Sequence, residues 1–132
     1  MSPAIQLLAV AVGGASGAVL RHLANEWFRL RAFSSLPLAT LSVNVIGCLL
    51  AGLLLAWLEL RGPQSNLWRS LLMVGFLGGL TTFSALGVEL LQYLRAGRLD
   101  LALWMTALNL LLGIGAAALG WIAGRMWVGS PS

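Results

Sequence analysis

The chain has 132 residues, of which 59% are hydrophobic and only 9% are charged. Soluble domains carry about a quarter charged residues, so this composition excludes a soluble globular protein and indicates an integral membrane protein. The net charge of +4 comes from eight arginines against four acidic residues, with no lysine. The arginines lie near the ends of apolar segments, where basic side chains contact lipid headgroups, so membrane lipid and not nucleic acid is the expected partner.

The first predicted span covers residues 4–23 and contains Gly13 and Gly17. Their GxxxG spacing allows a neighbouring helix to approach closely. Arg21 follows near the end of this span. We interpret it either as a side chain that snorkels to the interface or as a positive charge at a vestibule that raises the local anion concentration. The stretch from Asn25 to Ser35 is typical of an interfacial loop or a short amphipathic turn.

The second predicted span, residues 36–58, carries Thr40 and Asn44 four residues apart. The helical period places both on one face together with Gly47. An asparagine inside a membrane is costly unless it meets a partner or a water-filled path. An interhelical hydrogen bond and a role in an ion path are equally good readings of Asn44 alone.

The third predicted span, residues 67–94, follows a loop at Glu59–Asn66 and has its midpoint at Leu80 or Thr81. Glycine, threonine and serine are concentrated there, and they weaken a helix where no water can satisfy its backbone groups. Irregular backbone at that depth is tolerated where it is buried in protein or lines a cavity. Carbonyl groups freed by a break attract cations, so the pattern favours an ion site over simple close packing of helices.

The fourth predicted span, residues 101–124, follows a short turn and places Thr106, Asn109 and Gly113 on one helical face. Asn109 is a second amide within the membrane. Two amides on different helices beside a broken third helix resemble a polar track through the bundle. Glu89, toward the far end of the third span, is more often simply solvated in such a position.

These features predict an all-α membrane protein made of one domain, residues 1–132, with four transmembrane helices and both termini on the same side. The third helix is predicted to be broken at its centre. Arginines are distributed almost evenly between the two sides, so the positive-inside rule gives little preference for one orientation. A chain that inserts both ways could form an antiparallel two-fold dimer, in which the two breaks meet and their carbonyl groups enclose one cation.

Three stretches of the sequence resemble the Fluc (CrcB-type) fluoride channels. They are GFLGGLTTFS from Gly75 to Ser84, LATLSVNVIG from Leu38 to Gly47, and GGASGAVLR from Gly13 to Arg21. The first is highly specific, and the resemblance extends over all four predicted spans. It implies a passive fluoride-selective channel of the cell inner membrane that lowers the intracellular fluoride concentration.

The resemblance also implies an architecture and a set of site residues. The architecture is a dual-topology antiparallel homodimer with two pores and a structural sodium ion that is not transported. Backbone carbonyls of Gly78 and Thr81 would hold the sodium, and Arg21 would lie at the vestibule. The residues that would line the pore are Asn44, Phe83, Thr40, Ser84, Asn109 and Glu89.

The sequence departs from this family where a second phenylalanine and a tyrosine are common, since it has Leu86 and Met105 there. Two alternatives therefore stay open beside the channel. One is a small proton-coupled exporter similar to the multidrug transporters, although such chemistry needs an embedded carboxylate that the first span lacks. The other is a non-conducting subunit of a heteromeric channel. The sequence contains no pattern typical of an enzyme, such as a nucleophile with a base or a phosphate-binding loop after a strand.

Overall fold

A computed structural model of the chain describes residues 1–31 and 37–129, and these residues form helices joined by short turns. Three of the helices are long. They are α1 (Pro3–Arg31), α2 (Leu38–Arg61) and α6 (Leu99–Val128). Between α2 and α6 the chain passes through η1 (Gly62–Ser65), α3 (Asn66–Trp68), the π-helical η2 (Arg69–Leu77), α4 (Gly78–Leu80) and α5 (Phe83–Arg95).

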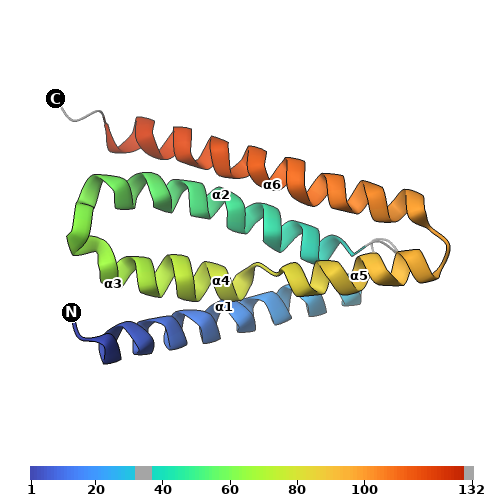
Figure 1. Cartoon of the computed structure of the whole chain (residues 1–132), viewed down its shortest axis with the longest axis horizontal. Helices are drawn as coiled ribbons and strands as arrows, with labels where there is room; N and C mark the ends of the chain where they lie inside the picture. The colour runs from blue at the N-terminus through green and yellow to red at the C-terminus, as the bar shows by residue number, and fades with distance from the viewer. Residues whose placement is uncertain (32–36, 130–132) are drawn as a thin grey trace.

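The helices lie side by side in an elongated bundle (Figure 1). The chain reverses direction at η1, so α2 and the segment from α3 to α5 run antiparallel to each other. Helix α2 packs along α6, and α1 packs against η2 and α4. The start of α1 and the end of α6 lie at the same end of the bundle (Figure 1), as the sequence predicted.

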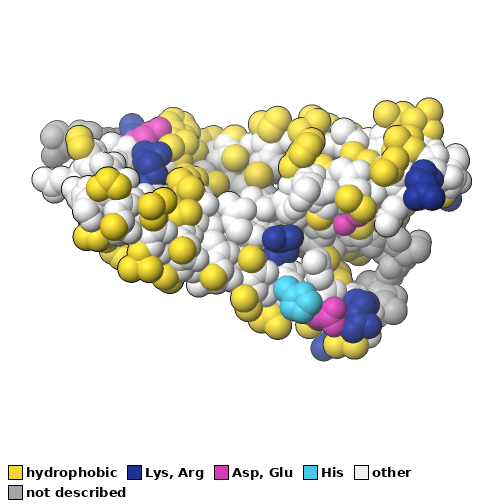
Figure 2. Space-filling view, turned by 60° about the horizontal axis from the view of Figure 1, so that its bottom comes forward, with side chains coloured by type: hydrophobic (Ala, Val, Ile, Leu, Met, Phe, Trp, Pro, Cys, Tyr) yellow, Lys and Arg dark blue, Asp and Glu magenta, His cyan; other side chains and the backbone are white. Residues whose placement is uncertain are grey.

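Three helical stretches are long and apolar enough to cross a membrane: Pro3–Arg31, Leu38–Arg95 and Leu99–Val128. The second has 58 residues, far more than the ~20 that a single span needs, and it contains the reversal at η1. The prediction of an all-α membrane protein is therefore confirmed. Large hydrophobic side chains are exposed along the bundle, and Figure 2 shows them spread over one face among few charged groups.

Helix α1 continues to Arg31, so the loop or short turn predicted from residue 25 onward is wrong as far as Arg31. Two contacts explain the longer helix. Arg29 pairs with Glu26 one helical turn earlier, with 2.6 Å between Nη2 and Oε2, and the Arg31 guanidinium lies over the Trp27 ring. Such contacts three and four residues apart stabilise a helix at a polar interface. The remainder of the predicted loop, residues 32–35, lies outside the described residues.

The predicted break in the third span is confirmed. Helix α4 ends at Leu80 and α5 begins at Phe83, and the two residues between them are extended. Thr81 has φ −83° and ψ 153°, and Thr82 has φ −150° and ψ 125°. The nine-residue π-helical segment before the break was not predicted from the sequence. Such segments are rare and often accompany functional sites.

Candidate functional site

The break removes helical hydrogen bonds from the carbonyl groups that precede it. In a continuous α-helix the Thr82 N–H would donate to the Gly78 carbonyl, four residues earlier. Here the Thr82 N–H donates instead to Asn44 Oδ1, at 2.8 Å. The Thr81 N–H and the Thr81 hydroxyl both donate to the Leu77 carbonyl, at 2.9 and 2.8 Å. The Gly78 carbonyl therefore loses the donor that a continuous helix would supply.

Asn44 of α2 bonds to the backbone of Thr82, the second residue of the break. Its Nδ2 group donates to the Thr82 carbonyl at 3.1 Å and to Asn109 Oδ1 at 3.0 Å, while its Oδ1 accepts from the Thr82 N–H. Asn109 in turn donates from Nδ2 to the Met105 carbonyl at 2.9 Å. The structure thus brings together the two asparagines that the sequence placed on separate polar faces, and the amide of Asn44 uses both of its N–H groups.

A hollow of about 390 Å³ opens beside these amides. Its wall includes Gly78 and Thr81 from one side of the break and Phe83 from the other, together with both asparagines. Phe83 leaves 84% of its surface exposed, whereas Leu86 leaves only 6%. The first aromatic position of the implied pore is therefore free to face a partner or an ion, and the second is buried within the chain.

The remaining polar residues of the predicted track are Thr40 of α2 and Ser84 and Glu89 of α5. The Thr40 hydroxyl donates to Glu89 Oε1, which links α2 to α5, and Thr40 itself is buried. Among the described residues, Glu89 Oε2 and the Tyr93 hydroxyl are buried without a hydrogen-bond partner. Ser84 lies near the break, with its hydroxyl 3.3 Å from that of Thr82. The predicted residues thus form one group at the break and a second group around Glu89.

Arg21 reaches the break from α1. Its Nε group donates to the Gly79 carbonyl at 3.0 Å, a contact between residues 58 positions apart. The side chain is partly buried there. The contact places Arg21 beside the break, because this part of α1 packs against η2 and α4.

Thr82 is a site residue that the sequence analysis did not single out. Its N–H and carbonyl both bond to Asn44, and its hydroxyl accepts from the Ala85 N–H at 3.2 Å. Threonine is a favoured residue at the position before a helix, where its oxygen satisfies an N–H of the first turn. The signal that could have identified it is a threonine that follows the predicted break and stands directly before the apolar start of the next helical stretch.

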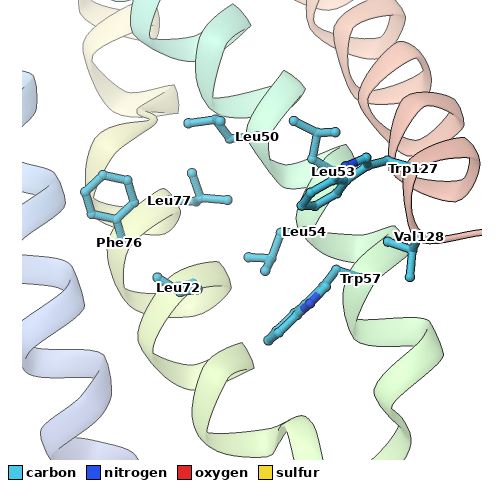
Figure 3. Close-up of a pocket in the computed structure, with 10 residues that line it drawn as sticks. Leu50, Leu53, Leu54, Trp57, Leu72, Phe76, Leu77, Trp127 and Val128 are labelled. Atoms are coloured by element: carbon cyan, nitrogen blue, oxygen red, sulfur yellow. The ribbon is translucent and has the colours of Figure 1, made fainter.

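A second hollow, of about 450 Å³, lies between α2, η2 and the end of α6. Figure 3 shows its lining, which is made of leucine, phenylalanine, tryptophan and valine side chains such as Leu54, Leu77 and Trp57. Apart from the indole N–H groups of Trp57 and Trp127, these side chains offer an ion neither charge nor hydrogen-bond donors. The polar hollow at the break is therefore the candidate ion site.

Comparison with known proteins identifies the family of the chain. Residues 8–121 match the family described as CrcB-like protein, Camphor Resistance (CrcB). The chain is 43% identical over 108 residues to a fluoride-specific ion channel FluC of Xylella fastidiosa (strain M23), covering 82% of this chain and 81% of that protein. It is 41% identical over 123 residues to the fluoride-specific ion channel FluC of Xanthomonas euvesicatoria pv. vesicatoria (strain 85-10), covering 93% and 92%. These relatives are named as channels and not as enzymes, and the chain itself belongs to the CrcB-like family of ion channels.

Proposed function

We propose that the chain forms a passive fluoride-selective channel that lets fluoride leave the cell and so lowers its intracellular concentration. The observation that carries this proposal is the hollow at the break, where amide groups and an exposed phenylalanine surround an interruption in a membrane helix. The relatives named as fluoride-specific channels support the same choice of ion. The cell inner membrane is the proposed location.

The polar residues suit a small, strongly hydrated anion. A selective pore must replace the water around the ion with groups that bind it without trapping it. The ring edge of Phe83 is the positive part of its quadrupole and can face an anion. Asn44 can donate only by giving up a present acceptor, so a passing anion would displace the Thr82 carbonyl or the Asn109 oxygen from it. Thr40, Ser84, Asn109 and Glu89 are proposed to continue the path.

A structural sodium ion fits the residues at the break. The Gly78 carbonyl lacks its helical donor, and oxygen atoms are the ligands that hard cations prefer. Within the described part of the chain, no group of three His, Cys, Asp or Glu side chains could hold a metal instead. We propose that the carbonyls of Gly78 and Thr81 hold the ion, which would neutralise their dipoles and would not be transported.

An antiparallel homodimer would complete this site. One chain supplies only two such carbonyls, whereas a two-fold axis through the break would double the number. The proposal includes four membrane crossings at about residues 4–23, 36–58, 67–94 and 101–124. Since η1 reverses the chain, the stretch Leu38–Arg95 would supply two of them. Exposure of Phe83 on the same side of the chain as the hollow supports a partner at this face.

The buried position of Leu86 favours one alternative, a non-conducting subunit that works with a different chain. In that case the missing aromatic edge would come from the partner. The proton-coupled exporter has less support, because the carboxylate of Glu89 lies on α5 against Thr40 and not in the first span.

Fluoride efflux from liposomes that contain the purified protein tests the proposal. Sodium would be present on both sides and then replaced by a large organic cation, and chloride-loaded liposomes would serve as the selectivity control. Rapid, sodium-dependent fluoride efflux without comparable chloride efflux is the expected result. A folded dimer that releases no fluoride would contradict the homodimeric channel and would favour the heteromeric alternative.

A further inference from the structure

Arg21 lies where α1 and the broken helix approach each other most closely. A Cβ atom added to Gly17 would clash with the Phe76 carbonyl, and one added to Gly79 would clash with the Gly14 carbonyl. These glycines let the two backbones touch. Arg21 is one turn beyond Gly17 on α1, so its side chain reaches the Gly79 carbonyl directly.

The carbonyls of Gly78 and Gly79, which are neighbours at the break, differ in their hydrogen bonds. In an unbroken helix Gly78 would accept from the Thr82 N–H and Gly79 from the Phe83 N–H. Asn44 has taken the Thr82 N–H, which leaves the Gly78 carbonyl without that donor. The Gly79 carbonyl has received a replacement donor from Arg21, at 3.0 Å. Side chains from two other helices therefore determine which carbonyl remains available.

We propose that Arg21 is a positioning residue for the cation site: it holds the Gly79 carbonyl and so leaves Gly78 as the glycine ligand. This inference rests on the sodium site proposed above. Without the bond, the Gly79 peptide is free to turn, and the backbone on either side of it, including Gly78, loses its fixed direction. A cation would then have to order that backbone as it binds, which weakens its affinity.

This role differs from that of a vestibule charge. A charge attracts anions over a distance, and salt screens this attraction. The effect does not depend on the exact position of the charged nitrogen. A positioning bond requires a donor at the place of Arg21 Nε. Glutamine carries its amide nitrogen the same number of bonds from the backbone as arginine carries Nε, but it is neutral.

Three variants separate these roles. Arg21→Gln keeps a donor at the Nε position and removes the charge. Arg21→Met has similar length but neither donor nor charge. Arg21→Lys keeps the charge and places its nitrogen one bond farther out. For each variant, fluoride efflux from liposomes would be measured against sodium concentration, and the sodium dependence of the thermal unfolding temperature would be measured in detergent without fluoride.

We expect Arg21→Met to raise the sodium concentration for half-maximal efflux and for half-maximal thermal stabilisation by about tenfold, the effect of one charge-assisted hydrogen bond. Arg21→Gln should stay within about threefold of the unsubstituted protein in both measurements. Its maximal efflux can fall, because the loss of charge lowers the local anion concentration. Arg21→Lys should show the reverse, with near-normal maximal efflux and a raised sodium requirement.

The proposal is overturned if Arg21→Met leaves the sodium requirement unchanged, or if Arg21→Gln shifts it as far as Arg21→Met does. Should the methionine variant fail to fold, Arg21→Lys takes its place: an unchanged sodium requirement in Arg21→Lys, or a shift in Arg21→Gln as large as that in Arg21→Lys, would overturn the proposal. Measurements on the unsubstituted protein distinguish a failure of this inference from a failure of the proposed channel function. Efflux that does not depend on sodium would refute the inference and leave the channel standing, whereas absence of fluoride efflux would refute the channel itself.

Discussion

Two pairs of helices in this chain pack closely through glycines. In one pair both helices are continuous, and in the other pair one helix is interrupted. In the pair α2 and α6, Gly52 lies against the Ala117 carbonyl and Gly120 against the Leu49 carbonyl, so closely that neither has room for a Cβ atom. In the pair formed by α1 with η2 and α4, Gly13 and Gly17 meet carbonyl groups in the same way. Close packing through small residues is therefore common to both pairs.

The difference lies in the backbone. Helices α2 and α6 run unbroken from Leu38 to Arg61 and from Leu99 to Val128, so the interior backbone groups of each helix keep their helical partners. The helix that packs on α1 is interrupted at Thr81 and Thr82, and side chains from α1 and α2 bond to its free groups. A glycine contact alone thus indicates packing, whereas polar side chains that reach a broken backbone indicate a site.

The glycines of the break itself divide in the same way. Gly75 and Gly79 would each clash with α1 if they carried a Cβ atom. Gly78 would not, since the nearest described atom outside its own turn is the Met73 carbonyl oxygen at 3.9 Å. Packing within the chain requires glycine at positions 75 and 79. It does not require glycine at position 78, where an ion or a partner chain would be the reason for it.

The largest effect is expected for Asn44→Ala, which removes the side chain that holds the break. Fluoride efflux should fall by at least about 100-fold, and the free energy of unfolding should fall by roughly 2–4 kcal/mol, because several buried groups lose their partners. The three hydrogen bonds of Asn44 show why stability should fall as well.

Thr106→Ala is the matched control in the continuous pair, because among the described residues the Thr106 hydroxyl bonds only to the Ala102 carbonyl of its own helix. It should change the free energy of unfolding by less than about 0.5 kcal/mol. Efflux assays and denaturant titrations in detergent would measure both variants. Equal effects of the two substitutions would remove the distinction between the broken and the continuous helices.

Phe83→Ala should affect conduction and not stability. The ring is 84% exposed, so its removal should change the stability of the chain by less than about 0.5 kcal/mol, while efflux falls as strongly as for Asn44→Ala. Leu86→Ala provides the opposite case, because that side chain is buried and its loss should cost roughly 2–5 kcal/mol. If Phe83→Ala conducts normally, Phe83 does not line the pore.

Gly79→Ala and Gly78→Ala should separate packing from ion binding within the break. The first should cost about 1–3 kcal/mol, since the added methyl group meets the Gly14 carbonyl. The second should leave the fold of the chain unchanged and weaken the sodium dependence of efflux. The sodium dependence of efflux and of thermal unfolding, measured for both variants, would test this. A sodium response that is unchanged in Gly78→Ala would count against Gly78 as a ligand.

How far the sequence could predict the site is clearest from Asn44 and Arg21. The density of glycine and threonine located the break at Leu80 or Thr81, one residue from where α4 ends, and the helical period marked Asn44 and Asn109 as polar points inside the membrane. The period could not show that these two amides touch each other and Thr82, since contacts between distant segments depend on how the helices pack.

The contact of Arg21 with the broken helix could not be predicted for a related reason. Its charge and its place at the end of residues 4–23 were typical of a membrane boundary, but α1 continues to Arg31 and carries Arg21 well inside the helix. The apolar run ended before the helix did, because contacts of Glu26, Arg29 and Trp27 extend the helix in polar sequence. Hydropathy therefore did not locate the end of the helix, and the position of Arg21 beside the break followed only from the structure.

The smallest effect is expected for Gly115→Ala in α6. A Cβ atom at Gly115 would meet nothing within 4 Å among the described residues, so alanine should change the free energy of unfolding by no more than about 1 kcal/mol and leave efflux unchanged. Gly87 of α5 has the same open surroundings within the chain but lies one turn after Phe83, on the face proposed to meet the ion or the partner. Gly87→Ala should therefore reduce efflux or dimer formation at unchanged stability of the chain, as measured by flux and by chromatography in detergent. If Gly87→Ala and Gly115→Ala give the same efflux and the same dimer formation, the α5 face with Phe83 makes no more contacts in the assembled protein than the α6 face with Gly115. That result would contradict a partner or an ion at the α5 face.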